Sequence, residues 1–407
     1  MSISCWAATS PRRLVDDEGM IRLRLPRTSR RLLLLGICVL SISAVSPAVA
    51  AAATTTATTS IDTSKQDCVY SAHSISILDS FEQLVGRPIN CVTVYTAPTT
   101  WQNFETPWFI NYYASDSDWS QWATTPGTQR RLVIGQPLFP TSADNTNWLE
   151  AGASGAYAGY DRALAQNLVA AGLGNSIIRL GYEANGTWNA DSFGSTPAKW
   201  ALWDQFWSRT VLAMRSVPGA HFLFDWCIAA LYRPLPLAQI YPGNSVVNII
   251  GIDAYDTGNL GSTAAARWNT VYNGADGIAD VLNFAKANGK PISIPEWGVS
   301  PTADSDGFGA DPTFVNGIAS VVRNNPVAYQ SYFYKYGYAT QLADGPLSLT
   351  AYRADFGAEG TSVGSNAARR SSTKVAAHKR AHHKHKSRHP RPRTHRKRKS
   401  RRARRRK

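Results

Sequence analysis

Two glutamates follow short apolar runs, where their carboxyl groups could exchange protons with a substrate. Glu183 ends the run "IIRLGYE" and Glu296 ends "KPISIPE", and each has an aromatic neighbour, Tyr182 or Trp297. Taken singly, either glutamate is most simply a solvated or salt-bridged surface residue. Two glutamates in matching contexts are harder to explain in that way. We therefore predict that the two carboxyls act together in acid–base or nucleophilic chemistry.

Other catalytic chemistries lack the residues they need. His73 and His221 are the only histidines outside residues 369–407. Neither a three-histidine zinc site nor an H-E-x-x-H helix can be built from them. A serine triad would need one of the two as its base, and no G-x-S-x-G elbow accompanies them. We expect both histidines to be structural, and the sequence implies no metal and no organic cofactor.

The elements around the glutamates predict their scaffold. Short β-like runs alternate with helical patterns, which favours a parallel sheet. Eight such units over roughly 290 residues predict an α/β fold, a (β/α)8 TIM barrel. An open doubly wound sheet is the alternative, weakened because neither G-x-G-x-x-G nor G-x-x-x-x-G-K-[ST] follows an early strand. The expected strands are Cys68–Tyr70, Cys91–Tyr95, Arg131–Gln136, Ser176–Tyr182, His221–Cys227, Val247–Tyr255, Pro291–Glu296 and Tyr329–Tyr334.

In such a barrel the carboxyl ends of the strands meet at one mouth. Glu183 is expected to close the fourth strand and Glu296 the seventh. The alternation of strand side chains places Arg179 on the face of Glu183, and it places Tyr255 of "GIDAYD" beside the seventh strand. Carboxyls about 5–5.5 Å apart would fit a retaining glycosidase, and about 6.5–9.5 Å an inverting one.

The motifs at these strand ends resemble those of a known family. "RLGYEANGTW", "YPGNSVVNIIGIDAYD" and "PEWG" are similar to the strand-four, strand-six and strand-seven motifs of glycoside hydrolase family 26. The resemblance extends from "AGASGAYAGYDRAL" to "QSYFYKYG". Family members are retaining, endo-acting enzymes, mostly β-mannanases, with some acting on mixed-linkage β-glucan or β-1,3-xylan. The resemblance implies Glu183 as the proton donor (acid/base) and Glu296 as the nucleophile.

One departure from the family pattern concerns the substrate. Family mannanases usually carry His before the acid/base glutamate, in a position that touches the sugar, and Tyr182 stands there in this chain. The first expected substrate is β-1,4-mannan. The alternatives are an endo-β-glucanase or β-xylanase of the same barrel family, and a non-catalytic glycan-binding wall protein. The last is disfavoured because a purely binding barrel needs neither glutamate.

The electrostatics of the predicted site agree with these roles. Arg179 and Tyr255 could keep Glu296 ionised, and the charge of Glu296 would raise the pKa of Glu183. Arg179 has an alternative role as a structural partner of a buried acid. Tryptophans that follow strand ends could stack on pyranose rings or could be ordinary packing. The full expected substrate-binding set is Arg179, Tyr182, Asn185, Trp188, Trp226, Tyr255 and Trp297.

The first 65 residues are typical of an exported protein. Residues 1–50 contain a charged region, an apolar run from Leu32 to Val45 and a small-x-small pattern at Ala48 to Ala50, as in a signal peptide. The run is too short to span a membrane. Met20 could be the true start, and Ser29-Arg30-Arg31 hints at twin-arginine export, with general export as the alternative. Residues 51–65 form an Ala/Thr-rich linker, so we expect a secreted, extracellular protein without a transmembrane segment.

The other end of the chain is strongly basic. Residues 369–407 carry twenty Lys and Arg and no acidic residue. Residues 1–50 have a net charge of +4, which leaves −9 of the total +15 for residues 51–368. We predict a barrel over 66–358 and a disordered Lys/Arg/His-rich tail over 359–407. The tail is expected to contact an anionic cell-surface polymer, with no specific nucleic acid as partner. A solubilising extension is the alternative.

Three cysteines remain once residues 1–50 are set aside. Cys68 and Cys91 are close enough in sequence to form a disulfide in an exported protein. Cys227 lies in an apolar run and is expected to be a buried thiol.

Overall fold

A computed structural model describes residues 66–110, 116–141, 147–257, 260–299, 310–334, 342 and 345–357. All of them belong to one compact unit, Ser60–Lys407. The predicted signal peptide, linker and basic tail lie outside the described residues. Within the described ranges, no helix combines the length and the apolar character that crossing a membrane requires.

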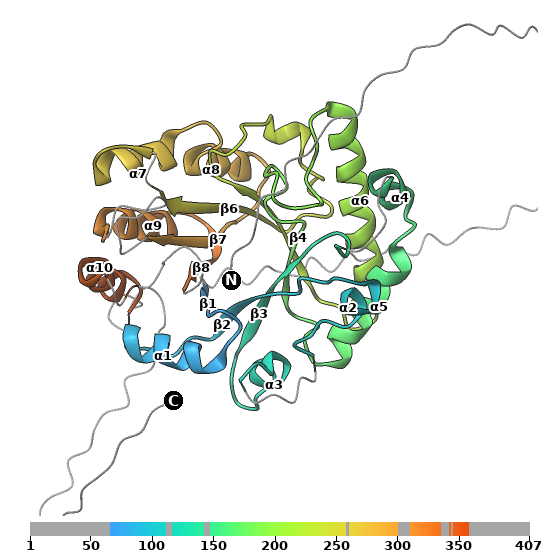
Figure 1. The fold of residues 1–407 in the computed structure, drawn as a ribbon, viewed down its shortest axis with the longest axis horizontal. Coiled ribbons are helices and arrows are strands. Elements are labelled where there is room, and N and C mark those ends of the chain that lie inside the picture. Colours follow the sequence, from blue (N-terminus) through green and yellow to red (C-terminus); the bar gives the residue numbers. More distant parts are fainter. Residues whose placement is uncertain are drawn as a thin grey trace, which may run out of the picture. The chain divides into compact units, whose positions relative to one another are not determined.

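The strands form a closed parallel barrel in sequence order, in which β1 pairs with both β2 and β8. Figure 1 shows the strands at the centre and the helices around them. The predicted (β/α)8 fold is confirmed, and the expected bounds of β2 and β3 coincide with the observed ones. The strands of the described chain are β1 (Gln66–Tyr70), β2 (Cys91–Tyr95), β3 (Arg131–Gln136), β4 (Ile177–Leu180), β5 (Leu223–Ala229), β6 (Ile249–Asp256), β7 (Ile292–Val299) and β8 (Val327–Phe333).

Helices follow the strands and cover the outside of the barrel (Figure 1). They bury apolar stripes against the outward faces of the strands, as the helical spacing of their apolar residues predicts. The described helices are α1 (Ile75–Val85), α2 (Trp101–Glu105), α3 (Trp119–Ala123), α4 (Trp148–Ser154), α5 (Ala158–Ala170), α6 (Pro197–Arg215), the 3-10 helix η1 (Leu237–Gln239), α7 (Ala264–Asn273), α8 (Ile278–Ala287), α9 (Pro312–Asn324) and α10 (Pro346–Phe356).

Helix α6 supports the segment that follows β4. It begins with Thr196, whose side chain accepts from the backbone N–H of Lys199, and with Pro197 in its first turn. The indole N–H of Trp207 donates to the carbonyl of Leu180 (2.9 Å), and that of Trp203 to the carbonyl of Asp191 (2.7 Å). Both rings are fully buried. Trp200, Trp203 and Trp207, spaced three and four residues apart on α6, are therefore packing residues, and they fix the backbone on both sides of Glu183.

The interior of the barrel is polar below its mouth. Asp225 on β5 accepts hydrogen bonds from Ser293 (2.7 Å) and Tyr329 (2.5 Å), and its pKa is raised to about 6 by burial. A side chain at Gly251 would place a Cβ 2.8 Å from oxygens of both Asp225 and Ser293, so glycine leaves the room that this network needs. Burying polar groups is tolerated here because they bond to one another.

A disulfide joins Cys68 on β1 to Cys91 on β2, two residues that are partners in the strand register. The bond closes a sequence separation of 23 residues, for which the loop-entropy model gives about 3 kcal/mol of stabilisation. Cys227 is a buried free thiol. The sequence-based expectations for all three cysteines are met.

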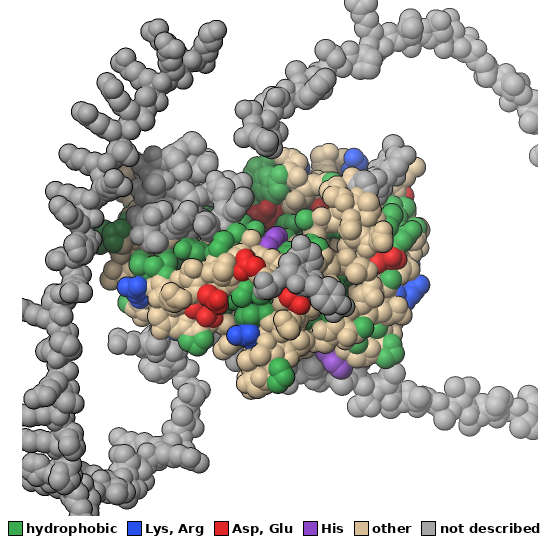
Figure 2. Space-filling view, turned by 60° about the horizontal axis from the view of Figure 1, so that its bottom comes forward, with side chains coloured by type: hydrophobic (Ala, Val, Ile, Leu, Met, Phe, Trp, Pro, Cys, Tyr) green, Lys and Arg blue, Asp and Glu red, His purple; other side chains and the backbone are tan. Residues whose placement is uncertain are grey.

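Charged side chains on the visible face of the barrel are scattered. In Figure 2 the red acidic and blue basic groups lie apart from one another, and no basic patch gathers on this face. The basic character of the whole chain therefore does not extend to this surface of the folded unit.

Candidate active site

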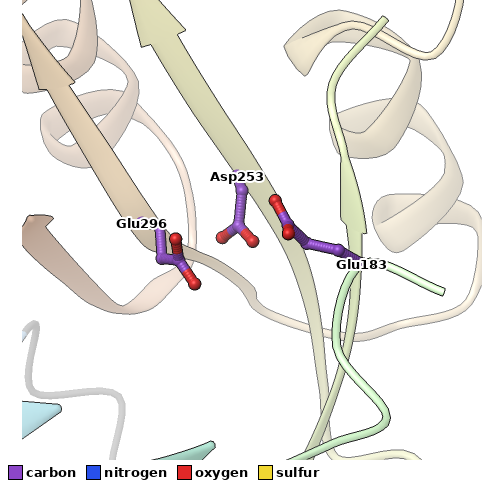
Figure 3. A group of neighbouring side chains, drawn as sticks. All are labelled: Glu183, Asp253 and Glu296. Carbon is purple, nitrogen blue, oxygen red and sulfur yellow. The ribbon is translucent and has the colours of Figure 1, made fainter. Parts of the chain in front are cut away.

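Three carboxyl groups converge at the mouth of the barrel. Glu183 follows β4, Asp253 lies on β6 and Glu296 on β7, and Figure 3 shows their side chains pointing toward one another. One oxygen of each lies within 4.8 Å of the others. Residues 113 positions apart in the sequence are thus brought into a single cluster, as the barrel predicts for Glu183 and Glu296.

Glu296 is held by three donors from three strands. Its Oε1 accepts from the Tyr95 hydroxyl (2.5 Å) and from the guanidinium of Arg179, and its Oε2 accepts from the Tyr255 hydroxyl (2.9 Å). The residue is only 8% exposed. Burial and the charge of Glu296 raise the pKa of Tyr95 and of Tyr255, so both phenols stay protonated and donate. These three hydrogen bonds fix the orientation of the Glu296 carboxyl group.

Arg179 connects two of the three carboxyls. It is fully buried on β4 and forms ion pairs with both Asp253 and Glu296. Its guanidinium also lies over the ring of Tyr182, with 4.7 Å from Cζ to the ring centroid. The alternative that Arg179 is a structural partner of a buried acid is therefore also met, because Asp253 is such an acid. One cation serves two carboxylates and orients both.

Glu183 does not lie on the strand that was predicted to end with it. β4 ends at Leu180, and Glu183 has left-handed backbone geometry with φ 52°. The expectation that the strand alternation places it on the face of Arg179 is therefore wrong. Instead the turn directs its carboxyl toward the barrel axis, and its N–H bonds to the carbonyl of Cys227 on β5 (3.1 Å). A left-handed non-glycine residue is strained, a feature that gathers at functional sites.

The environment of Glu183 favours its protonated form. Burial raises the pKa of this carboxyl to about 7, and the charge of Glu296 adds to the rise. Arg179 and an N–H donor oppose it: the indole of Trp188 donates to Oε2 at 2.7 Å. Glu183 therefore keeps a proton up to about neutral pH, while Glu296 has donors suited to an anion.

Asp253 is a third member of the site that the sequence-based prediction did not include. Burial raises its pKa well above the usual value against the opposing effect of Arg179, and the charges of Glu296 and Glu183 add to the rise. Its Oδ1 has no hydrogen-bond partner among the described residues. Three carboxyls thus share a single guanidinium, so at least one proton must remain in the cluster near neutral pH.

Oxygen clusters of this kind can bind divalent cations, and the three acids have the required ligand atoms. Here Arg179 already supplies the positive charge to Asp253 and Glu296. The arrangement is therefore better suited to proton transfer than to metal binding.

A pocket of about 390 Å³ opens beside Glu183. Its lining includes Glu183, Asp253 and Tyr255 together with the exposed rings of Trp188 and Tyr232. The two rings meet edge to face with centroids 4.4 Å apart. Aromatic rings beside carboxyl groups are suited to a ligand that has both apolar faces and hydroxyls.

Three of the residues predicted to touch a substrate are packing or scaffold residues instead. The rings of Trp226 and Trp297 are fully buried outside the strands, against Tyr241 and against Tyr352 respectively. Strand alternation explains both positions: each follows an inward residue, Asp225 or Glu296, and so faces the helices. These two predictions are wrong.

Asn185 is also corrected to a scaffold residue. Its side-chain amide is buried, donates to the carbonyl of Ala229 and accepts from the N–H of the same residue, both at 2.8 Å. These two hydrogen bonds tie the turn after β4 to the end of β5. Asn185 therefore holds Glu183 in place, and its amide is buried and not open to a sugar.

Tyr95 is a site residue that the sequence-based prediction missed. It lies at the end of β2, and its hydroxyl accepts from Arg179 (3.0 Å) while donating to Glu296. The signal was available, because a polar side chain at the carboxyl end of a barrel strand points to the mouth. His73 accepts from the backbone N–H of Tyr95 (3.1 Å), and burial lowers the pKa of His73 to about 4. That neutral, structural histidine agrees with the expectation for it.

A (β/α)8 barrel with two glutamate carboxyls facing each other at its mouth is the arrangement of a glycosidase. Residues 157–297, which include both glutamates, match the family model described as glycosyl hydrolase family 26. The chain is a glycosidase, and its resemblance to glycoside hydrolase family 26 is confirmed over this segment.

Solved structures support the fold. The chain is similar to Bacillus subtilis mannanase BCman and to Bacillus subtilis mannanase man26, each with 15% identity, a TM-score of 0.51, and coverage of 72% of this chain and 85% of the other. The YdhT protein from Bacillus subtilis has 16% identity with the same TM-score and coverage. No curated protein matches the chain. At these identities the likeness concerns the barrel alone.

Proposed function

We propose that the protein is a secreted, retaining glycoside hydrolase that cleaves β-linked polysaccharide by double displacement. The observation that carries the proposal is the approach of Glu183 and Glu296, whose carboxyl oxygens lie within 4.8 Å. That approach supports the retaining geometry, with carboxyls about 5–5.5 Å apart, over the inverting one, which needs room for a water molecule between carboxyl and sugar.

In the first step Glu296 attacks the anomeric carbon and forms an ester bond as the glycosidic bond breaks. Glu183 gives its proton to the departing sugar oxygen. Arg179, Tyr95 and Tyr255 orient the attacking carboxylate. Because the ester is neutral, the pKa of Glu183 then falls, and this carboxylate can take a proton from the water that attacks the anomeric carbon and releases Glu296.

The best candidate substrate is β-1,4-mannan. Support comes from the family 26 match and from the mannanases named among similar structures. Mixed-linkage β-glucan and β-xylan are the alternatives. Tyr182 leaves them open, because it stands where family mannanases usually carry His, and its ring packs against Tyr95 and under Arg179 next to the acid/base residue. We assign sugar contacts to Tyr182, Trp188 and Tyr255, whereas the fully buried Arg179 acts through Glu296.

We further propose export through the N-terminal signal peptide and retention near the cell surface through the basic tail. Twenty Lys and Arg in residues 369–407 would bind an anionic polymer with a strong dependence on salt. Cells that secrete the full chain would be washed at rising ionic strength. Release that increases with salt supports an electrostatic tether, and release independent of salt rejects it.

Hydrolysis is tested with a reducing-sugar assay on glucomannan, mixed-linkage β-glucan and β-xylan. The Glu183→Ala and Glu296→Ala variants should each lose the activity that the parent protein shows. NMR of the first product should show the β-anomer before mutarotation. Full activity in either variant, or an α-anomer as first product, would contradict the mechanism. No activity of the parent protein on any of the three polymers would favour a glycan-binding wall protein.

A further inference from the structure

We propose that Trp188 is a positioning residue that fixes the catalytic proton of Glu183 on one carboxyl oxygen. Its indole holds Oε2, so that Oε1 carries the proton to the departing sugar and later receives the proton from water. The proposal rests on the proposed role of Glu183 as the acid/base residue. It assigns Trp188 a part in proton transfer beyond a stacking contact with sugar.

The direction of the hydrogen bond carries this assignment. The indole Nε1–H can only donate, and it lies 2.7 Å from Oε2 of Glu183. An oxygen that accepts from the indole cannot also point a proton at it. The carbonyl oxygen of a carboxyl group is a better acceptor than its hydroxyl oxygen, so in the acid form this hydrogen bond favours the proton of Glu183 on Oε1, whereas an unassisted carboxyl would divide it between two oxygens.

Gly186 and Tyr232 hold the indole of Trp188 in this position. A Cβ at Gly186 would lie 2.5 Å from the Trp188 ring, so only glycine lets the ring lie across the turn. Tyr232 packs edge to face against the ring, and its hydroxyl shares a 2.8 Å hydrogen bond with Thr187. Trp188 is nevertheless 50% exposed and lines the pocket beside Glu183.

Because its neighbours act in opposite directions, the pKa of Glu183 is sensitive to the loss of a single hydrogen-bond donor. Burial and the negative charges favour protonation, while Arg179 and the Trp188 N–H favour the anion. Removing the N–H leaves Arg179 and a hydrogen bond with Asp253 on the side of the anion, and Arg179 already pairs with two other carboxylates. The titratable groups that face Glu183 are Arg179 and Tyr182 from β4 and the turn after it, Asp253 and Tyr255 from β6, and Glu296 from β7.

Because the ring of Trp188 is half-exposed, a bound substrate can contact the residue that positions the proton of Glu183. A sugar bound on the leaving-group side of Glu183 would meet the same indole whose N–H orients the carboxyl. Stacking would immobilise the ring and so strengthen the placement of the proton when a leaving group is present. Trp188 thus couples occupancy of the pocket to acid catalysis.

The test removes the N–H and keeps the ring. In Trp188→Phe, and in a protein with 3-benzothienylalanine at position 188, where sulfur replaces N–H, the alkaline limb of kcat/KM on the hydrolysed polymer should move up by about one pH unit. kcat/KM at the optimum should fall about 10-fold. With 2,4-dinitrophenyl β-mannobioside (or the cellobioside or xylobioside, as the polymer assay directs), kcat/KM should stay within about twofold, because that leaving group needs no proton.

Trp148→Phe on α4 is the matched control and should leave the pH profile unchanged. If the Trp188→Phe protein does not fold, the pH profile of the benzothienylalanine protein tests the proposal instead. An unmoved alkaline limb, or an equal loss on polymer and on the dinitrophenyl glycoside, would reduce Trp188 to a stacking residue and overturn the proposal. Failure of the proposed function is a separate result, namely an active Glu183→Ala protein.

Discussion

Glu183 and Glu296 reach the same mouth of the barrel from two different kinds of backbone. Glu296 lies inside β7, buried, with donors from Arg179, Tyr95 and Tyr255. Glu183 lies in a turn with left-handed geometry, half-buried, and the half-exposed Trp188 donates to it. A nucleophile needs one fixed, ionised state, whereas an acid/base group must change its protonation twice per cycle. The buried strand position of Glu296 and the half-exposed turn position of Glu183 match these two requirements.

We expect the largest loss of activity when Glu296, the carboxylate on the strand, is replaced. Glu296→Gln keeps the shape of the side chain but cannot form the ester, so we expect kcat to fall by more than about 10⁴-fold. Steady-state hydrolysis of the preferred polymer measures this. Glu150→Gln on the exposed surface of α4 is the matched control and should be fully active. A loss below 100-fold in Glu296→Gln would place the nucleophile elsewhere.

Arg179→Met should destabilise the barrel, since it leaves the buried carboxyls of Asp253 and Glu296 without their cation. Removing one partner of a buried ion pair costs about 3–5 kcal/mol. The free energy of unfolding in urea at pH 7 is the measurement, with the exposed Arg162→Met on α5 as control. Because protonating the two acids relieves the unpaired charge, the deficit should shrink as the pH is lowered. A deficit that is the same at all pH values would contradict the account.

The two hydroxyl donors to Glu296 are tested by removing each hydroxyl separately. Tyr95→Phe and Tyr255→Phe each remove one hydrogen bond to the carboxylate, a loss of about 1.5–3 kcal/mol for a charged acceptor. We expect kcat/KM to fall roughly 10- to 100-fold in each. Tyr272→Phe on α7 serves as the control. Wild-type rates in both site variants would mean that the donors do not orient the nucleophile.

The smallest effect concerns the pH profile. Glu183 must be protonated at the start, and its pKa is raised to about 7, so kcat/KM should be retained below pH 7 and lost as the pH rises through 7. The same raised pKa makes the folded state bind a proton that the unfolded chain has released, so its contribution to stability is fully present below pH 4.5 and is lost as the pH rises from there through about 7.

Glu296→Gln supplies the complementary titration. Without the charge of Glu296, the pKa of Glu183 should fall, and carbon-13 NMR of labelled glutamate would follow its midpoint. Burial is the larger cause and remains, so the pKa should stay above its usual value. A midpoint that does not move would show that the two carboxyls are not electrostatically coupled.

Much of the fold follows from the sequence because strand and helix periods are local. The alternation that marks β2 and β3 predicts their bounds, and the stripe of α6 predicts its buried face. The same alternation, applied to Trp226 and Trp297, would have placed both rings outside the barrel. Their assignment as sugar contacts failed because proximity to a strand end was weighed above the direction of the side chain.

The turn that carries Glu183 could not be read from the sequence in the same way. Its left-handed backbone depends on bonds to β5, through the N–H of Glu183 and the side chain of Asn185. These partners are more than forty positions away, at Cys227 and Ala229, and no local pattern encodes them. The hydrogen bond from Trp188 to Glu183 depends on the same tertiary arrangement.

The central claim is that Glu296 attacks the sugar while Glu183 supplies the proton. It is tested most directly by trapping the ester with 2,4-dinitrophenyl 2-deoxy-2-fluoro-β-mannobioside, or the corresponding cellobioside or xylobioside, followed by mass spectrometry of the digested protein. The account predicts one glycosyl group per chain, attached to Glu296. A label on Glu183, on Asp253 or on any other residue would contradict it.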